Sequence, residues 1–162
     1  MGQTKNMKKA SVCANPGQRA KRRILVVEDN KSVQDILSVI LRSMGFEVAL
    51  AKNGLEALTV FIESCFDLVL TDLQMPIMDG SRLARLIKEM SPETPIILLT
   101  GADMETVKEK VESGALESVI FKPFKIDDLQ NAVQGALGLR KAKQGVTPQS
   151  RKERFYSQIL LV

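Results

Sequence analysis

Five short apolar runs, separated by segments with helical periodicity, limit the folds open to this chain of 162 residues. They lie at residues 24–27, 47–50, 68–70, 96–99 and 119–121. The runs are rich in branched side chains and too short for helices, so they predict β-strands. Because strands that alternate with helices form a parallel sheet covered on both faces, we expect one α/β domain.

Amphipathic segments fill the spaces between these runs and follow the last of them. In the first segment, Ser32 with Asp35 three positions later predicts a helix start, and Gly45 predicts its end. The fourth segment is weaker, and Gly114 is expected to end it. Five helices and five strands are therefore expected over the middle of the chain.

Charge is distributed unevenly along the chain. Residues 1–23 contain seven Lys and Arg and no acid, and residues 140–162 contain six with one acid. The middle, residues 24–139, has ten bases against eighteen acids, a net charge of −8. We therefore expect a disordered basic tail over 1–21, a folded domain over 22–139, and a basic tail with a short apolar end over 140–162.

Several classes of protein are excluded by what the sequence does not contain. There is no histidine, which excludes Ser-His or Cys-His triads and histidine-liganded zinc. No apolar run approaches the roughly 18–20 residues that span a bilayer, and the start has no secretory signal. The two cysteines, Cys13 and Cys65, are too few for a disulfide scaffold, and Cys65 is expected to be a buried, reduced thiol. A cytoplasmic location is expected.

Polar groups follow four of the five predicted strands: Glu28-Asp29, Asp72, Thr100-Gly101 and Lys122-Pro123. The carboxyl ends of parallel strands meet at one edge of a sheet, so these groups should converge. Three carboxylates in one place repel each other unless a cation neutralises them. Oxygen ligands in a wet, shallow site suit Mg²⁺.

The same groups suit phosphoryl transfer. A cation, the Lys122 ammonium, the Thr100 hydroxyl and the amide of Gly101 would together receive the three oxygens of a phosphoryl group. Asp72 would then be the nucleophile and would form an acyl phosphate. Any one of these residues alone is more often a loop residue, a helix cap or a solvated charge. Their position after four separate strands favours an organised site.

Four motifs of the chain resemble the receiver domain of response regulators, the phosphoacceptor half of bacterial two-component signalling. They occupy residues 24–30 (ILVVEDN), 70–80 (LTDLQMPIMDG), 98–102 (LLTGA) and 121–124 (FKPF). The resemblance covers about residues 22–139. It implies a flavodoxin-like (βα)5 three-layer sandwich whose parallel sheet has the strand order 2-1-3-4-5. It also implies Mg²⁺-dependent phosphorylation of Asp72 by a histidine kinase or a His-phosphotransfer protein.

The resemblance assigns the metal ligands. Glu28 and Asp29 resemble the acidic pair that positions Mg²⁺ in this family. We expect that Mn²⁺ can take the place of Mg²⁺. Asp72 and the backbone carbonyl of Gln74 resemble the remaining protein ligands. Gly80 is expected to meet either a steric requirement or a positive φ.

The resemblance also assigns the switch residues. Thr100 resembles the hydroxyl that follows the phosphoryl group, Lys122 the lysine of the family, and Pro123 is expected after a cis peptide bond. Val119 stands where relatives often have Tyr or Phe, so a smaller change is expected at the face formed by strand 4, helix 4 and strand 5. That face is expected to bind the downstream partner. Phe121 is expected in the core.

Gln74 and Ala102 occupy positions that tune dephosphorylation in relatives. Ala102 has no polar group to hold an attacking water, so moderate to slow self-hydrolysis is expected.

Four functions are compatible with the sequence. The first is a stand-alone receiver, a signalling module and not an enzyme beyond its own slow phosphorylation and dephosphorylation. The second is the receiver of a longer regulator with an output domain. The third is an aspartyl-phosphate hydrolase, which Gln74 disfavours because it stands where such enzymes have a general acid. The fourth is a degenerate receiver, which the full set of site residues disfavours.

Partners are less determined by the sequence. No helix-turn-helix pattern accompanies the basic tails, so we expect no specific DNA binding. Phosphorylation-dependent dimerisation stays open.

Overall fold

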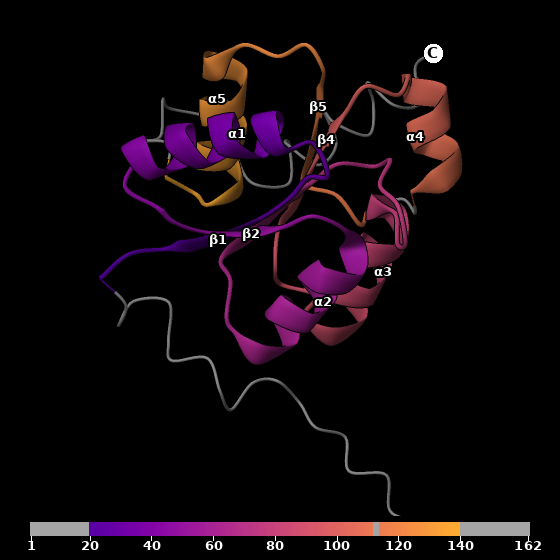
Figure 1. Ribbon diagram of the computed structural model, residues 1–162, viewed down its shortest axis with the longest axis horizontal. Coiled ribbons are helices and arrows are strands. Elements are labelled where there is room, and N and C mark those ends of the chain that lie inside the picture. Colours follow the sequence, from indigo (N-terminus) through magenta and orange to yellow (C-terminus); the bar gives the residue numbers. More distant parts are fainter. Residues whose placement is uncertain (1–19, 112–113, 140–162) are drawn as a thin grey trace, which may run out of the picture.

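The computed structural model describes residues 20–111 and 114–139, which form a five-stranded parallel sheet between two layers of helices (Figure 1). The strands are β1 (Arg23–Val27), β2 (Glu47–Ala51), β3 (Leu68–Thr71), β4 (Ile96–Thr100) and β5 (Ser118–Phe121). Their order is β2-β1-β3-β4-β5, and every neighbouring pair is parallel. The predicted fold class and strand order are confirmed. The predicted tails lie outside the described residues, apart from residues 20 and 21.

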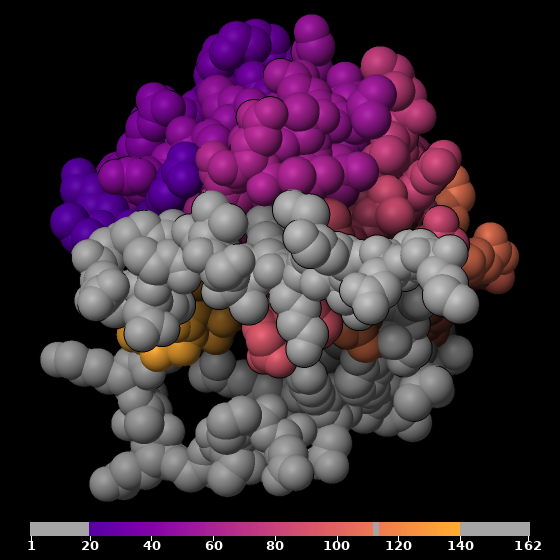
Figure 2. Space-filling model, turned by 90° about the horizontal axis from the view of Figure 1, so that it is seen from below, coloured from indigo at the N-terminus to yellow at the C-terminus, as the bar shows by residue number. Residues whose placement is uncertain are grey.

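Five helices of the described residues cover the sheet. In Figure 1, α1 (Lys31–Ser43) and α5 (Ile126–Ala136) lie on the upper side, and α2 (Gly54–Glu63) and α3 (Gly80–Met90) lie below. The short helix α4 (Met104–Lys110) shares the hydrophobic cluster of α2 and α3. Figure 2 views the molecule from the side of α2 and α3, which pack against each other. No helix within residues 20–111 and 114–139 is long and apolar enough to cross a membrane.

The strands divide their side chains between two hydrophobic clusters. Alternate residues of β1, such as Leu25 and Val27, join the cluster under α2, α3 and α4, whereas Ile24 and Val26 join the cluster under α1 and α5. The three central strands are buried almost throughout, because helices cover both of their faces. The edge strands β2 and β5 are only partly buried.

Asparagine and aspartate side chains begin four of the five helices. The predicted start of α1 at Ser32 is wrong, because Asn30 is the cap and its Oδ1 accepts from the backbone N–H groups of Ser32 and Val33. Gly45 follows the end of α1 with φ +92°, as its predicted role as a stop signal requires. Helix α4 ends at Lys110, four residues before the expected stop at Gly114.

Two predictions about single side chains are wrong. Phe121 was expected in the core but is 38% exposed, because it lies on the edge strand β5. Cys65 is half-buried and is not a free thiol. Cys13 lies outside the described residues.

Candidate functional site

Three carboxylates meet at the carboxyl ends of two neighbouring strands. Glu28 and Asp29 follow β1, Asp72 follows β3, and one oxygen of each lies within 4.8 Å of the others. Glu28 is 2% exposed and Asp72 is 8% exposed, whereas Asp29 is exposed. The predicted convergence of the acids is therefore what the fold produces, with one carboxylate open to solvent and two buried.

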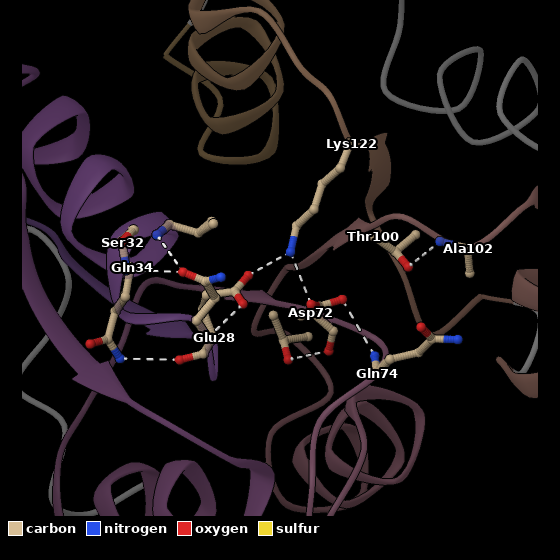
Figure 3. Close-up of polar contacts among 11 residues, drawn as sticks. Glu28, Ser32, Gln34, Asp72, Gln74, Thr100, Ala102 and Lys122 are labelled. Atoms are coloured by element: carbon tan, nitrogen blue, oxygen red, sulfur yellow. Dashed lines mark hydrogen bonds and ion pairs between the residues drawn. The ribbon is translucent and has the colours of Figure 1, made fainter.

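Lys122 reaches these acids from the end of β5, across β4. Its Nζ lies 2.7 Å from Oε2 of Glu28 and 2.9 Å from Oδ2 of Asp72 (Figure 3). The peptide bond to Pro123 is cis, as predicted. One ammonium therefore bridges two buried carboxylates that come from strands β1 and β3.

Burial and ion pairing have opposite effects on the pKa values of Glu28 and Lys122. Burial raises the pKa of Glu28 above its ordinary value. The hydrogen bonds from the Lys122 ammonium and from the backbone N–H of Asn30 act against this rise but do not cancel it. Burial by itself would lower the pKa of Lys122. Its hydrogen bonds to Glu28 and Asp72 outweigh that effect, and the pKa of Lys122 is raised. Lys122 therefore stays charged, and its two carboxylate partners are what stabilise that charge.

The donor set fits a small divalent cation. Ionised Glu28, Asp29 and Asp72 with protonated Lys122 give a net charge of −2, which one divalent ion neutralises. The donors are all oxygens, and the exposed Asp29 carboxylate leaves an open side. Mg²⁺ prefers oxygen ligands and keeps several of its waters, so an open cluster of this kind suits it.

Thr100 and Gly101 lie at the end of β4 on the same rim of the sheet. Thr100 is fully buried, and its Oγ1 accepts from the backbone N–H of Ala102 at 3.0 Å (Figure 3). Gly101 is exposed, and a Cβ built on it would have no heavy atom within 4 Å. The carbonyl of Thr100 accepts from the N–H of Lys122 at 2.8 Å, which ties the ends of β4 and β5 together.

The loop after β3 packs against the backbone of Asp72. The N–H of Gln74 donates to Oδ1 of Asp72 at 3.3 Å, and the metal-binding role of the Gln74 carbonyl stays a prediction. A Cβ on Gly80 would lie 2.0 Å from the carbonyl oxygen of Asp72. The φ of Gly80 is not in the left-handed region, so of the two expected reasons for this glycine the steric one holds.

Val119 stands at the position where the sequence resemblance implies that relatives often have Tyr or Phe. It is half-buried and packs against the cluster under α2, α3 and α4. Its neighbour on the same side of β5, Phe121, is exposed. The structure therefore offers no buried aromatic ring at Val119 that could move.

Gln34 is a supporting residue that the sequence analysis missed. It is buried on α1, and its Nε2 donates to the carbonyl oxygen of Glu28 at 3.3 Å (Figure 3). The same Nε2 donates to the carbonyl oxygen of Ala51 at 3.1 Å. It thus holds the ends of β1 and β2 under the site. A polar residue on the inward face of an amphipathic helix is the signal that could have revealed it.

Comparison with known proteins bears on the family. The sequence model of the response regulator receiver domain matches residues 24–134. The chain belongs to the response regulator receiver family. Among curated relatives of this receiver domain, the transcriptional regulatory protein ZraR of Klebsiella oxytoca is 38% identical over 133 residues, which are 82% of this chain and 30% of ZraR.

The regulatory protein AtoC of Escherichia coli is 40% identical over 125 residues, which are 76% of this chain and 27% of AtoC. The chain thus spans about 30% of the length of these two relatives.

A solved receiver structure agrees with the fold. The response regulator TrrA of Thermotoga maritima, in a complex with Mg²⁺-BeF, aligns with a TM-score of 0.67 and 34% identity. The alignment covers 72% of this chain and 99% of TrrA. The family match and the fold therefore agree that residues 24–134 form a receiver domain of two-component signalling.

Proposed function

We propose that this receiver domain accepts a phosphoryl group on Asp72 in a Mg²⁺-dependent reaction, with a histidine kinase or a His-phosphotransfer protein as donor. One observation carries the proposal: Lys122 bridges the buried carboxylates of Glu28 and Asp72 inside a cluster of three acids. The Mg²⁺ complex of the similar protein TrrA supports the same ion. The domain supplies the nucleophile and carries the product, so it acts as a signalling module and not as an enzyme with a separate substrate.

The side chains divide the work of transfer. An oxygen of the ionised Asp72 carboxylate attacks phosphorus, the bond from phosphorus to the donor nitrogen breaks, and that nitrogen keeps the electron pair. The ammonium of Lys122 is already within hydrogen-bonding distance of the Asp72 carboxylate and offsets negative charge on the transferring oxygens. Glu28, Asp29 and Asp72 would hold Mg²⁺, which neutralises phosphoryl oxygens when bound.

Phosphorylation changes the contacts around Asp72. The ion pair between Lys122 and Asp72 has to give way, because a phosphoryl oxygen becomes the partner of the ammonium. The hydroxyl proton of Thr100 can be donated to another phosphoryl oxygen, while Oγ1 of Thr100 accepts from Ala102. With Val119 in place of an aromatic ring, we propose that Thr100 and the loop after β4 transmit the change to a downstream partner on the β4–α4–β5 face.

The relatives favour a longer protein as the setting. ZraR is a transcriptional regulatory protein, and the chain matches only 30% of it. We therefore propose, as a second candidate, that this receiver controls an output domain in a longer regulator. The expectation of no specific DNA binding then applies to the receiver alone, and DNA binding would belong to the output domain.

Intact mass spectrometry tests the proposed chemistry. The full chain is incubated with acetyl phosphate and Mg²⁺, and we expect a single phosphoryl adduct. EDTA should abolish it, because the acids then repel each other and the incoming phosphate. Asp72→Asn should also abolish it, because the amide is not a nucleophile.

Asp35→Asn is the matched control, since it removes an exposed carboxylate on α1 outside the acid cluster. It should leave the adduct unchanged. An adduct of full yield on Asp72→Asn would overturn the assignment of the nucleophile. A folded wild-type chain that takes phosphate neither from acetyl phosphate nor from a phosphorylated His-phosphotransfer protein would overturn the proposed function.

A further inference from the structure

A basic pocket lies at the opposite end of the sheet from Asp72. Its volume is about 480 Å³, and it opens beside the first residues of β1 and β2 and the end of α1. Its lining comprises Lys21, Arg23, Arg42, Phe46, Glu47, Val48 and Ala49. None of these residues belongs to the phosphorylation site.

The pocket concentrates positive charge on an acidic domain. Lys21 and Arg42 are exposed, and their side chains form no hydrogen bond or ion pair within residues 20–111 and 114–139. Arg23 forms an ion pair with Glu47 at 3.5 Å and lies over the ring of Phe66. Three cations against one acid leave a net charge of +2, although residues 24–139 together carry −8. The pocket therefore attracts anions, whereas the acidic remainder of the domain repels them.

One wall of the pocket is the free edge of β2. Among the described strands, β2 pairs only with β1. The N–H of Glu47 donates to the carbonyl oxygen of Arg22, and the carbonyl oxygen of Ala51 accepts from the backbone N–H of Glu28. Because alternate residues of a strand direct their backbone groups to opposite edges, the N–H and C=O groups of Val48 and Leu50 face away from β1.

Apart from Glu47 at its first residue, which is ion-paired with Arg23, nothing in β2 itself blocks pairing along this edge. Its sequence, EVALA, contains no lysine and no proline, and its five-residue register with β1 has no bulge. These are the usual devices that protect a sheet edge. The half-buried Val48 and Leu50 offer apolar side chains next to their unpaired backbone groups. The edge is thus suited to an added strand, with the cations of the pocket at one end of it.

We propose that the β2 edge and the basic pocket together bind an extended acidic segment of a partner protein, which adds as a sixth strand. Backbone hydrogen bonds to Val48 and Leu50 would hold the segment, and Lys21 and Arg42 would select acidic side chains. Charge complementarity excludes the chain's own ends as the occupant. Residues 1–19 contain four bases and no acid, and residues 140–162 contain six bases and one acid.

Nuclear magnetic resonance on the full, ¹⁵N-labelled chain tests this proposal. The probe is the peptide acetyl-Glu-Val-Glu-Val-Glu-amide at low salt. We expect saturable shifts that are largest at the amides of Val48 and Leu50, with slower hydrogen exchange at both. Lys21→Glu/Arg42→Glu should weaken binding at least fivefold, and so should 0.5 M NaCl, because salt screens exposed charges.

Two comparisons separate strand addition from simple attraction of charge. Lys108→Glu/Lys125→Glu changes the net charge equally at exposed positions on α4 and before α5, and it should bind the peptide like the wild type. The peptide N-methylated at every amide between residues keeps its charge but has no backbone N–H to donate at either edge, so it should lose binding.

Equal binding of the methylated peptide, or shifts that avoid β2, would overturn the proposal. So would concentration-dependent self-association of the chain alone through this edge, because the occupant would then be a second copy.

Discussion

The two ends of the sheet carry charge in opposite ways. At the carboxyl ends of the strands, Glu28 and Asp72 are buried and share one ammonium. At the start of β1 and β2, Lys21 and Arg42 are exposed and form no ion pair within the described part of the chain. At the first end buried charges pair with each other, whereas the second end is an exposed basic surface.

This difference shows how burial decides what a charge can do. Buried charges interact strongly and shift each other's pKa values, so a charge added among them, such as the proposed phosphoryl group, acts on each of them. Exposed charges are screened by water and salt, so they contribute little to stability and remain available to a partner. The acidic end is therefore suited to switching and the basic end to recognition.

The largest loss of stability is expected from adding a side chain at Gly80, next to the backbone of Asp72. Gly80→Ala places a methyl group against a backbone carbonyl that cannot move aside, so the free energy of unfolding should fall by about 3 kcal/mol. Urea unfolding followed by circular dichroism measures this. Gly101→Ala at the same rim is the control and should cost less than about 1 kcal/mol, since no atom lies near its Cβ. Equal losses would show that the packing at Gly80 is not tight.

The next effect should come from removing the shared ammonium. Lys122→Met leaves Glu28 buried without its partner, and we expect a loss of about 2 kcal/mol at pH 8, less than for a fully buried pair because Lys122 is 25% exposed. Burial raises the pKa of Glu28, and losing Lys122 raises it further. The native state then binds a proton more readily than the unfolded state, so stability is regained as the pH falls.

Urea unfolding of the Lys122→Met variant at pH 8 and pH 5 checks that sign. The double variant Lys122→Met/Glu28→Gln should recover most of the loss at pH 8, because no unpaired charge is left at Glu28. A loss for Lys122→Met that is the same at both pH values would contradict a charge effect.

A smaller effect is expected from the metal. If Mg²⁺ binds the folded acid cluster, ten times its dissociation constant should raise the free energy of unfolding by about 1.4 kcal/mol. Asp29→Asn removes the exposed ligand and should reduce this gain, while Asp35→Asn should leave it intact. Thermal unfolding with and without Mg²⁺ measures both. A gain that survives in Asp29→Asn would remove that carboxylate from the metal site.

The smallest loss of stability is expected from a substitution at the basic end of the sheet. Arg42→Gln should lower the free energy of unfolding by about 0.5 kcal/mol or less, because Arg42 is exposed and acts on the rest of the domain only through the dipole of α1. Even this loss should shrink in 1 M NaCl. Urea unfolding at the two salt concentrations tests it, and a loss near that of Lys122→Met would mean that the two ends do not differ in the way described.

Much of the acidic end could be predicted from the sequence. Parallel strands place their carboxyl ends on one edge, so residues that follow β1, β3, β4 and β5 had to meet there, and Glu28, Asp72 and Lys122 do meet. The strand pattern gave the layers for the same reason, since a run of apolar residues without alternation needs cover on both faces. These features depend only on periodicity and chain order.

Other features depend on distances between segments that are remote in the sequence. The reason for Gly80 is the carbonyl of Asp72 at 2.0 Å from its missing Cβ, and the role of Gln34 is set by two carbonyls on different strands. Phe121 was misassigned because the sequence does not show which side chains of the edge strand β5 the helices leave uncovered. Asn30 was missed because two cap residues stand close together, and only the backbone decides which one accepts.

The sequence by itself thus determined the order of strands and helices and the chemistry of the residues that follow the strands, because both are written in local patterns of side chains. Only the tertiary structure decided that one ammonium bridges two buried acids, and that Lys21 and Arg42 share a pocket with an unpaired strand edge. Both of these depend on which distant segments pack side by side and on how much water their packing leaves.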